Sequence, residues 1–355
     1  MSFASRPAWI AIDEGATPLR RPLWIILGPI PLLLALTSSS APPRAPAGPQ
    51  AAAEGVPATQ LAQPIHDPCI VKERDTYHVF ATGPGIPEIV SRDLVHWKPA
   101  GRVFEGDGPA WIHEELPESR GLWAPDICFY GGRYHLTYAV SRFGSNRSII
   151  GMASSRTLDR ASRDYGWVDE GKVTESRRED NFNAIDPNIL PLDRRRLALT
   201  FGSFWSGIKL LPLDTATGKP LPDAKPIALA QRPSPDALEA PFLIRRGRWF
   251  YLFVSFDFCC RGLNSTYNVR VGRSERLEGP YADRDGKPML EGGGTQITFP
   301  EGTRVGPGHC AVLRDGGRDY LATHYYDGAR NGFPTLQVLP MTWDRDGWPA
   351  VGRAR

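Results

Sequence analysis

The sequence predicts an all-β fold on three observations. Its 355 residues include 36 glycines, 34 prolines and 10 tryptophans, a composition that favours many short strands joined by turns. It contains no convincing long amphipathic helical pattern. Five segments share one pattern, in which a first apolar run, a short polar turn and a second apolar run follow one another. Hairpins recurring every roughly 50 to 70 residues predict the blades of a five-bladed β-propeller.

The five hairpins begin with related residues. In chain order, the starts are His66-Asp67-Pro68, Trp123-Ala124-Pro125-Asp126, Ala184-Ile185-Asp186-Pro187, Glu239-Ala240-Pro241 and Gly308-His309-Cys310. Four of the five place Asp, Glu or His at or beside the start of the first strand. If that strand lines the axis in every blade, radial symmetry brings these side chains together at one mouth of the channel. The sequence therefore predicts a polar site on the axis.

The N-terminal region has the pattern of a secretory signal. Leu23 to Leu36 is an apolar run that is too short for a membrane span of about twenty residues but fits the h-region of a signal peptide. We therefore expect residues 1–41 to be a signal peptide with a long n-region, with an uncleaved anchor as the alternative. Residues 42–62 are rich in Pro and Ala and predict a linker. Residues 63–355 would form the propeller of a secreted protein, extracellular or periplasmic.

Charge and cysteine content exclude some classes of protein. The formal net charge is only +3, and Arg residues are scattered among Asp and Glu, so no nucleic-acid track is expected. Cys69, Cys128 and Cys310 each fall in a first strand, where a buried thiol acts as a small hydrophobe. The adjacent Cys259-Cys260 predicts either a vicinal disulfide or two thiols on opposite faces of a strand. No CxxC pair is present, so a structural zinc site is not expected.

Three carboxylates are the candidate catalytic residues. One Asp-Pro or Glu-Ala-Pro at a strand start is ordinary turn chemistry, because Asp caps a turn and Pro stops premature pairing. Asp67, Asp186 and Glu239 recur at matching places in three repeats, and this recurrence favours a shared function. Asp126 follows its proline instead of preceding it, so we expect a structural role for Asp126.

Several motifs together make the chain resemble the family 43 glycoside hydrolases, and most closely their endo-acting α-1,5-L-arabinanases. The resemblance runs from about His66 to Pro349. It implies a five-bladed propeller and inverting hydrolysis of glycosidic bonds. The matching stretches are His66-Asp67-Pro68, Leu122-Trp123-Ala124-Pro125-Asp126, Phe143-Gly144-Ser145-Asn146, Ala184-Ile185-Asp186-Pro187-Asn188, Phe201-Gly202-Ser203-Phe204-Trp205, Glu239-Ala240-Pro241, Cys259-Cys260-Arg261-Gly262, Ser265-Thr266-Tyr267 and Gly306-Pro307-Gly308-His309.

The resemblance assigns a role to each carboxylate. It implies that Asp67 is the general base, that Glu239 is the general acid, and that Asp186 orients the acid and raises its pKa. An inverting glycosidase holds its base and acid about 6.5 to 9.5 Å apart to leave room for a water. The acid must stay protonated near neutral pH, and a neighbouring anion favours the protonated form by like-charge repulsion.

His309 holds the equivalent place in the fifth repeat. The resemblance implies that this histidine binds a metal ion, usually calcium, through one imidazole nitrogen and several waters. One histidine is a poor calcium site by the usual oxygen-rich rules, so a core histidine is the competing interpretation. His66 either packs under the sugar or hydrogen-bonds to Asp67.

The candidate substrate contacts are mostly aromatic. Trp123 and Phe143 match cleft-lining positions in the family and could cover the C–H face of a furanose, as could Trp205. Blade-to-blade packing is the alternative for these rings. The predicted substrate contacts are His66, Trp123, Phe143, Asn183 and Ser203.

These observations lead to one functional hypothesis and its competitors. We expect a monomeric enzyme that cuts internal α-1,5-linkages of arabinan or another arabinose-containing plant polysaccharide, without stable membrane association after processing. An exo-acting α-L-arabinofuranosidase or β-xylosidase of the same family is the first alternative. The stretch from Ser255 to Tyr267, which matches arabinanases, favours the endo-acting enzyme. A non-catalytic sugar-binding propeller is the second alternative, and the presence of both Asp67 and Glu239 argues against it.

Overall fold

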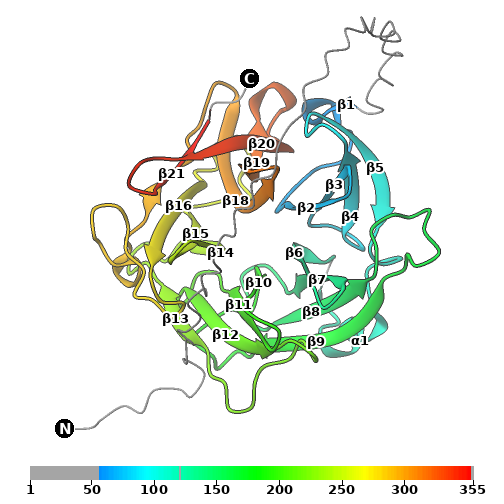
Figure 1. Ribbon diagram of the computed structural model, residues 1–355, viewed down its shortest axis with the longest axis horizontal. Helices are drawn as coiled ribbons and strands as arrows, with labels where there is room; N and C mark the ends of the chain where they lie inside the picture. The colour runs from blue at the N-terminus through cyan, green and yellow to red at the C-terminus, as the bar shows by residue number, and fades with distance from the viewer. Residues whose placement is uncertain (1–55, 120, 353–355) are drawn as a thin grey trace, which may run out of the picture. The chain divides into compact units, whose positions relative to one another are not determined.

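The computed structural model describes residues 56–119 and 121–352, and the predicted signal segment 1–41 lies outside them. The described residues form five antiparallel sheets arranged as the blades of a propeller (Figure 1). The predicted all-β, five-bladed fold is therefore confirmed. No helix among the described residues is long and apolar enough to cross a membrane.

Each blade is built from consecutive strands. Blade 1 contains β1 (Val56–Pro57), β2 (Cys69–Glu73), β3 (Thr76–Phe80), β4 (Pro87–Ser91) and β5 (His96–Arg102). Blade 2 contains β6 (Trp123–Tyr130), β7 (Arg133–Val140), β8 (Ser148–Ser155) and β9 (Val168–Ser176). Blade 3 contains β10 (Asn188–Pro191), β11 (Arg196–Phe201), β12 (Ile208–Asp214) and β13 (Ile227–Ala230).

The last two blades follow the same order. Blade 4 contains β14 (Leu238–Arg246), β15 (Trp249–Phe256), β16 (Asn268–Ser274) and β17 (Thr295–Gln296). Blade 5 contains β18 (Arg304–Asp315), β19 (Arg318–Asp327), β20 (Phe333–Trp343) and β21 (Pro349–Val351). The helical elements are α1 (Ala110–Glu115) and the 3₁₀ turns Ala58–Gln60, Gly262–Asn264, Met289–Glu291 and Gly328–Arg330.

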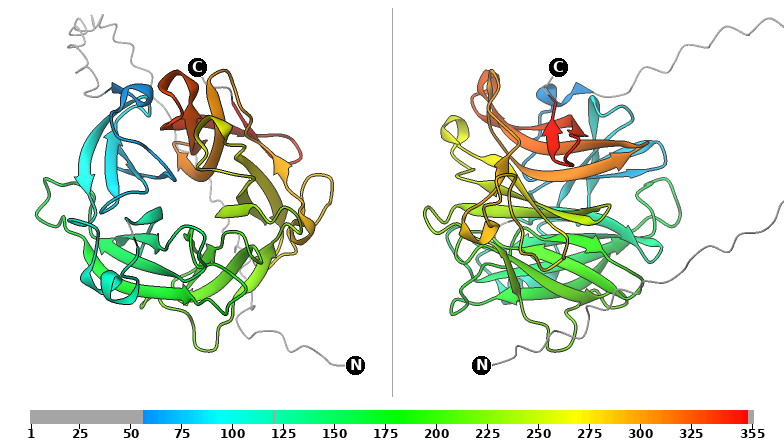
Figure 2. Two further views of the ribbon diagram at one scale, coloured as in Figure 1. Left: turned by 180° about the vertical axis from the view of Figure 1, so that it is seen from behind. Right: turned by 60° about the vertical axis from the view of Figure 1, so that its left-hand side comes forward.

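The first strand of each hairpin lies nearest the axis, as the sequence predicts. Figure 1 shows β2, β6, β10, β14 and β18 around the centre, and Figure 2 shows the same ring from behind and from the side. Each first strand pairs antiparallel with the next strand across the predicted polar turn, for example Tyr130 with Arg133. Neighbouring first strands also contact one another around the ring.

The hydrophobic core lies between blades and is supplied largely by the second strands. Phe80 in β3, Tyr138 in β7, Phe201 in β11 and Phe253 in β15 are almost completely buried. Burying one such side chain stabilises the folded state by roughly 1.5 to 3 kcal/mol. This packing holds the inner strands, and hence their polar starts, at fixed positions around the axis.

The described residues include a strand and a turn upstream of the expected boundary at residue 63. Val56 and Pro57 form β1, which pairs with Trp97 and His96 at the edge of blade 1. The predicted linker 42–62 therefore ends in an edge strand and a 3₁₀ turn. A two-residue strand without an apolar run gives too little signal to be detected in the sequence.

Blade 1 meets blade 5 without exchanging strands, and we call this contact the closing seam. Lys72 Nζ lies 2.9 Å from Asp315 Oδ2, and the Tyr77 hydroxyl donates to the same oxygen at 2.7 Å. The Ile65 N–H donates to the Pro334 carbonyl at 3.0 Å. Side-chain and loop contacts of this kind join the first blade to the last.

A left-handed residue recurs at the inner strand of all five blades: just before β2 and β10, within the first three residues of β6 and β14, and at the bulge in the middle of β18. Asp67, Ala124, Asp186, Ala240 and His309 have φ angles of 51°, 45°, 56°, 53° and 49°. Side chains other than glycine adopt this conformation rarely, and such residues concentrate at functional sites. Glu239 precedes its left-handed residue by one position, whereas Asp67 and Asp186 occupy theirs. The sequence places the three carboxylates at matching positions of their repeats. In the structure Glu239 is offset by one residue from the other two.

Candidate active site

The polar strand starts open into one cleft of about 760 Å³, a usual size for a ligand pocket. All five blades contribute to its walls. Every residue that the sequence placed in the site lines this cleft, namely His66, Asp67, Trp123, Phe143, Asn183, Asp186, Ser203, Glu239 and His309. The predicted convergence on the axis is therefore observed.

The side of the cleft that holds Asp67 is rich in histidine. Asp67 Oδ2 lies 2.8 Å from His66 Nδ1 and accepts the Thr82 hydroxyl at 2.6 Å. Asp67 Oδ1 lies 3.2 Å from His309 Nδ1. Burial opposes ionisation of Asp67, but the His66 and His309 imidazoles outweigh it and hold the pKa of this carboxyl well below its usual range. Asp67 is therefore ionised, as a general base must be.

Glu239 and Asp186 have the opposite environment. Burial and the negative charge of Asp67 raise the pKa of Glu239, although the Ser203 and Tyr267 hydroxyls oppose this rise. Burial and the charge of Glu239 raise the pKa of Asp186 to about 8. The Ser203 hydroxyl donates to Glu239 Oε2 at 2.7 Å. The raised pKa of each carboxyl group favours its protonated form, which a general acid requires.

Asp186 also orients the backbone that carries Glu239. The Ala240 N–H donates to Asp186 Oδ2 at 3.1 Å, so the carboxylate from blade 3 fixes the residue that follows the acid in blade 4. The Tyr267 ring packs closely against the backbone at Gly308. A Cβ at that position would collide with the ring. Tyr267 thus reaches Glu239 beneath a glycine of blade 5.

His309 lies where positive charge is favoured. Burial lowers its pKa, but the negative Asp67, Asp186 and Glu239 raise it overall, to about 9. The field at His309 therefore suits a cation, whether a proton or a metal ion. Calcium takes six to eight oxygen ligands at about 2.3 to 2.6 Å, and the described residues offer a single imidazole nitrogen beside one carboxylate. The residues match such an ion by charge, but waters would have to supply most of its ligands.

Two groups of described side chains lie close enough to share an ion, and neither contains His309. One joins His66 to Cys259 and Cys260, and the other joins His66, Asp67 and His324. In the first group both sulfurs form a disulfide, which leaves no thiolate to bind a metal. In the second group His324 Nδ1 accepts the Asp67 N–H at 3.1 Å, so that nitrogen is already engaged.

Asp126 makes structural contacts, in line with the role that the sequence predicts for it. It is buried, and Asp126 Oδ2 accepts the Ile189 N–H at 2.8 Å and the Asn188 side-chain amide at 3.2 Å. Burial raises its pKa to about 6. Asp126 therefore joins the inner strands of blades 2 and 3 below the cleft.

The candidate sugar contacts differ in exposure. Phe143 is 81% exposed and Trp205 is 37% exposed, and both line the cleft. Asn183 is buried and accepts the Ser148 hydroxyl at 2.7 Å. Exposed rings in a cleft are free to stack on a ligand, whereas Asn183 is held in place by its neighbour.

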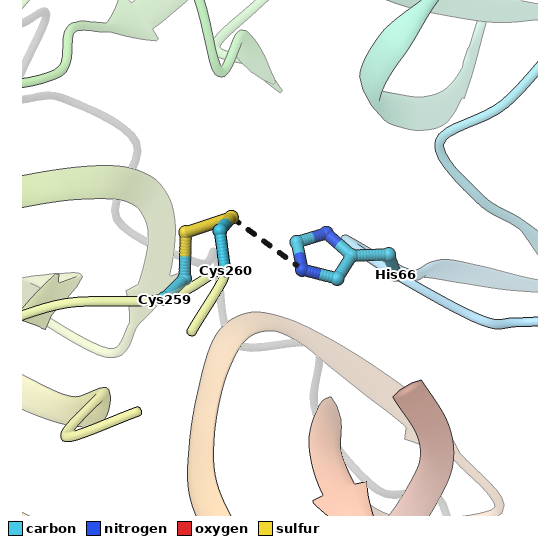
Figure 3. Close-up of side chains that lie close together, drawn as sticks. All are labelled: His66, Cys259 and Cys260. Carbon is cyan, nitrogen blue, oxygen red and sulfur yellow. Dashed lines mark hydrogen bonds between the residues drawn. A yellow bond between two sulfur atoms is a disulfide. The ribbon is translucent and has the colours of Figure 1, made fainter. Parts of the chain in front are cut away.

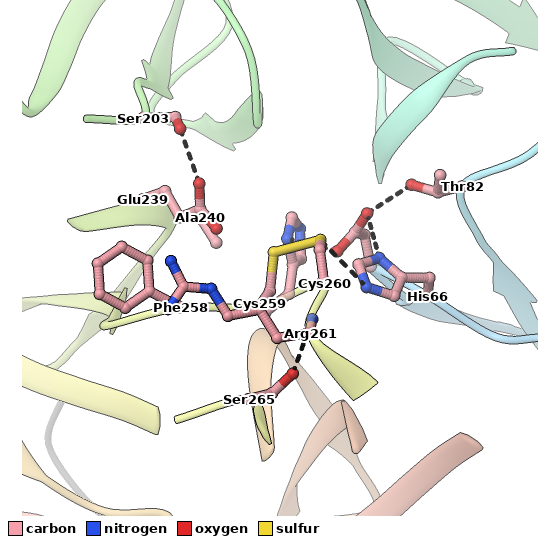
Figure 4. The surroundings of a disulfide bond; sticks show 12 residues. His66, Thr82, Ser203, Glu239, Ala240, Phe258, Cys259, Cys260, Arg261 and Ser265 are labelled. Carbon is pink, nitrogen blue, oxygen red and sulfur yellow. Dashed lines mark hydrogen bonds and ion pairs between the residues drawn. A yellow bond between two sulfur atoms is a disulfide. The ribbon is translucent and has the colours of Figure 1, made fainter. Parts of the chain in front are cut away.

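Cys259 and Cys260 form a disulfide, so the vicinal disulfide is the correct one of the two interpretations of this pair. The disulfide forms part of the cleft wall. Figure 3 shows the Cys260 sulfur directed toward the His66 ring, with Cys260 Sγ 3.9 Å from His66 Nε2. Figure 4 shows the surrounding residues, including Phe258, Arg261 and Ser265. Cys69, Cys128 and Cys310 are free thiols, as expected.

Known proteins are similar to this chain in sequence and in fold. The model of glycosyl hydrolases family 43 matches residues 60–349. The chain belongs to glycosyl hydrolase family 43. It is 40% identical over 299 residues to an extracellular exo-α-(1→5)-L-arabinofuranosidase of Cellvibrio japonicus, covering 81% of this chain and 86% of the relative. It is also 40% identical over 290 residues to an extracellular endo-α-(1→5)-L-arabinanase of Bacillus subtilis, covering 81% and 87%.

A solved structure extends the comparison of this family 43 enzyme. The α-L-arabinanase of Cellvibrio cellulosa complexed with arabinohexaose aligns with a TM-score of 0.78 at 39% identity. The match covers 82% of this chain and 96% of that chain. Membership of family 43 makes the protein a glycoside hydrolase and confirms the resemblance inferred from its motifs.

Several residues of the family 43 site were missed in the sequence. Thr82 donates to the Asp67 carboxylate from just beyond the end of β3. From β19, His324 accepts the backbone N–H of Asp67, and Tyr326 contacts His66. His324 and Tyr326 alternate along β19 and so lie on the same face of the strand as Tyr320 and Ala322. Two polar residues on one face of a buried second strand were the available signal.

Proposed function

We propose that this family 43 hydrolase cleaves internal α-1,5-L-arabinofuranosidic bonds of arabinan with inversion of configuration. The observation that carries the proposal is one cleft that holds Asp67, whose pKa is lowered, together with Asp186 and Glu239, whose pKa values are raised. Relatives named for endo-acting and exo-acting arabinan hydrolysis support the substrate class.

The geometry supports a division of labour. Asp67 removes a proton from a water that attacks the anomeric carbon, and Glu239 protonates the departing oxygen. When Asp186 is ionised, its charge favours the protonated form of Glu239. Through the Ala240 N–H, Asp186 also orients the backbone beside the acid. The exposed rings of Phe143 and Trp205 would cover sugar faces along the cleft.

Endo action is tested by product lengths. Purified protein incubated with linear arabinan should lower the viscosity before much reducing sugar forms, and short incubations should give oligomers of mixed length. The same assay with arabinoxylan and aryl furanosides checks the substrate class. A single short product from the first minutes onward would replace this proposal with exo action.

The exo-acting alternative has an observation in its favour. The Cellvibrio japonicus relative is named for exo action and is as identical to this chain as the endo-acting Bacillus subtilis relative. Chain-end blocking distinguishes the two actions, because arabinan with modified non-reducing ends remains a substrate for an endo-acting enzyme only.

A calcium ion held at His309 is part of the proposal. The negative field of the surrounding carboxylates supports it. Bound calcium, measured by elemental analysis, should be lost in His309→Ala and should fall less in His309→Gln, which keeps a polar ligand atom. Unchanged calcium in a folded His309→Ala protein would make His309 a core histidine that pairs with Asp67.

Secretion is the last part of the proposal. Two relatives are named as extracellular, and the N-terminal apolar run has the length of an h-region. Sequencing the N-terminus of protein recovered outside the cell should give a start between about residues 42 and 63. Recovery of full-length chains in membranes alone would favour the uncleaved anchor.

A further inference from the structure

A line of hydrogen bonds runs from the disulfide turn to Asp67. The Cys260 N–H donates to the Tyr326 hydroxyl oxygen at 2.6 Å. Tyr326 Oη lies 2.9 Å from His66 Nε2, and His66 Nδ1 lies 2.8 Å from Asp67 Oδ2. The turn belongs to blade 4, Tyr326 to blade 5, and His66 and Asp67 to blade 1.

One protonation pattern satisfies all three contacts. Because the Tyr326 oxygen accepts the Cys260 N–H, its own O–H can donate to His66 Nε2. His66 Nδ1 then carries the proton that it donates to Asp67. The three donors point in the same direction, so each bond fixes the orientation of the next group toward the carboxylate.

Packing restricts His66 from two further sides. Its ring stacks on His324 with centroids 3.9 Å apart, and Cys260 Sγ touches its edge at 3.9 Å from Nε2. His324 is completely buried and accepts the Asp67 N–H. The imidazole therefore has little freedom as long as the disulfide and Tyr326 keep their places.

The disulfide keeps Cys260 in an unusual conformation. Cys260 has a φ of 64°, in the left-handed region that residues with a Cβ rarely adopt. A disulfide between adjacent residues closes a ring that includes their shared peptide bond, and this ring fixes the direction of the Cys260 N–H. Opening the ring lets Cys260 return to an ordinary conformation and withdraws the N–H from Tyr326.

We propose that the Cys259–Cys260 turn and Tyr326 are positioning residues for the catalytic base, acting through His66, and that reduction of the disulfide slows catalysis. The inference rests on the assigned role of Asp67 in the proposed function. In the reduction a dithiol supplies two electrons and two protons. The S–S bond breaks, two cysteine thiols form, and the dithiol becomes a disulfide. The exposed Cys260 gives the reductant access from the cleft.

The first test compares hydroxyl-deleted variants. Tyr326→Phe should lower kcat on linear arabinan roughly three- to tenfold, the effect of one lost hydrogen bond, with KM within about twofold. Tyr325→Phe is the matched control, because the neighbouring residue on β19 faces the other side of the sheet and should keep kcat. An unchanged kcat in Tyr326→Phe would overturn the proposal.

The second test uses the reductant on the purified enzyme. Treatment with dithiothreitol should lower kcat at least as much as Tyr326→Phe, with two new thiols by mass spectrometry and an unchanged melting temperature. Cys259→Ser with Cys260→Ser should have the low kcat already and should not respond, which excludes the three free cysteines as the source. Two new thiols with unchanged kcat, or an effect on KM alone, would contradict the proposal.

A structural readout separates this inference from the assigned substrate. If the untreated enzyme does not hydrolyse arabinan, the proposed function fails and kinetics cannot decide. A crystal structure of the double serine variant then decides, because the inference requires the Tyr326–His66 contact to lengthen or the His66 ring to turn. An unmoved His66 would overturn the inference whatever the substrate.

Discussion

Asp67 meets three histidines on one side of the cleft, whereas Asp186 and Glu239 on the other side meet mainly each other and neutral hydroxyls. All three are largely removed from solvent, because only 14% of the Asp67 side chain is exposed and both Asp186 and Glu239 are buried residues. Burial opposes ionisation in every case. The charge of the neighbours, and not the depth of burial, therefore separates base from acid.

Removing each proposed catalytic carboxyl group tests the comparison most strongly. Asp67→Ala and Glu239→Ala should each lower kcat by about 10² to 10⁴, the usual contribution of general acid or base catalysis. A dinitrophenyl arabinofuranoside has a leaving group that needs no proton. If it is a substrate, it should restore the rate of Glu239→Ala and leave Asp67→Ala slow. Equal recovery of both variants, or retained anomeric configuration by NMR, would contradict the assignment.

A smaller effect is expected at Asp186. Because two facing carboxyl groups raise each other's pKa, Asp186→Asn should lower the pKa of Glu239. Glu239 must be protonated to act, so the rate falls as the pH rises through its pKa. The basic limb of the kcat profile should therefore move to lower pH, and the rate at its maximum should also fall. A basic limb that stays in place would mean that Asp186 orients Glu239 without affecting its protonation.

The smallest effects come from two matched hydroxyls. Thr82 donates to Asp67 and Ser203 donates to Glu239, at 2.6 and 2.7 Å. Each bond favours the ionised carboxylate, so its loss raises the pKa of its partner. Thr82→Val should move the acidic limb, and Ser203→Ala the basic limb, each upward by roughly half a unit to one unit. The pH dependence of kcat in both variants checks this prediction. Movement of the same limb in both variants would contradict the assignment of the two limbs to Asp67 and Glu239.

The features that could be predicted from the sequence are those that recur in each repeat. The five hairpins, their polar turns and the convergence of Asp67, Asp186 and Glu239 followed from one pattern repeated along the chain. The pattern did not show that Glu239 lies one position before its left-handed residue, because backbone conformation at Ala240 leaves no mark on residue type. His324 and Tyr326 were also missed, because their role depends on contacts between the last blade and the first.

The closing seam between blades 1 and 5 passes through the active site. Asp67 belongs to the first blade, whereas His309, His324 and Tyr326, which fix it and His66, belong to the last. The two ends of the β-strand series thus meet at the proposed base, and among the residues that the structure describes no shared strand joins them. Slight parting of these two blades would misplace the base while every sheet stayed intact. The hydrolytic rate therefore depends on contact between the first and last blades. On mild heating or in dilute denaturant, activity should be lost before the β-sheets unfold.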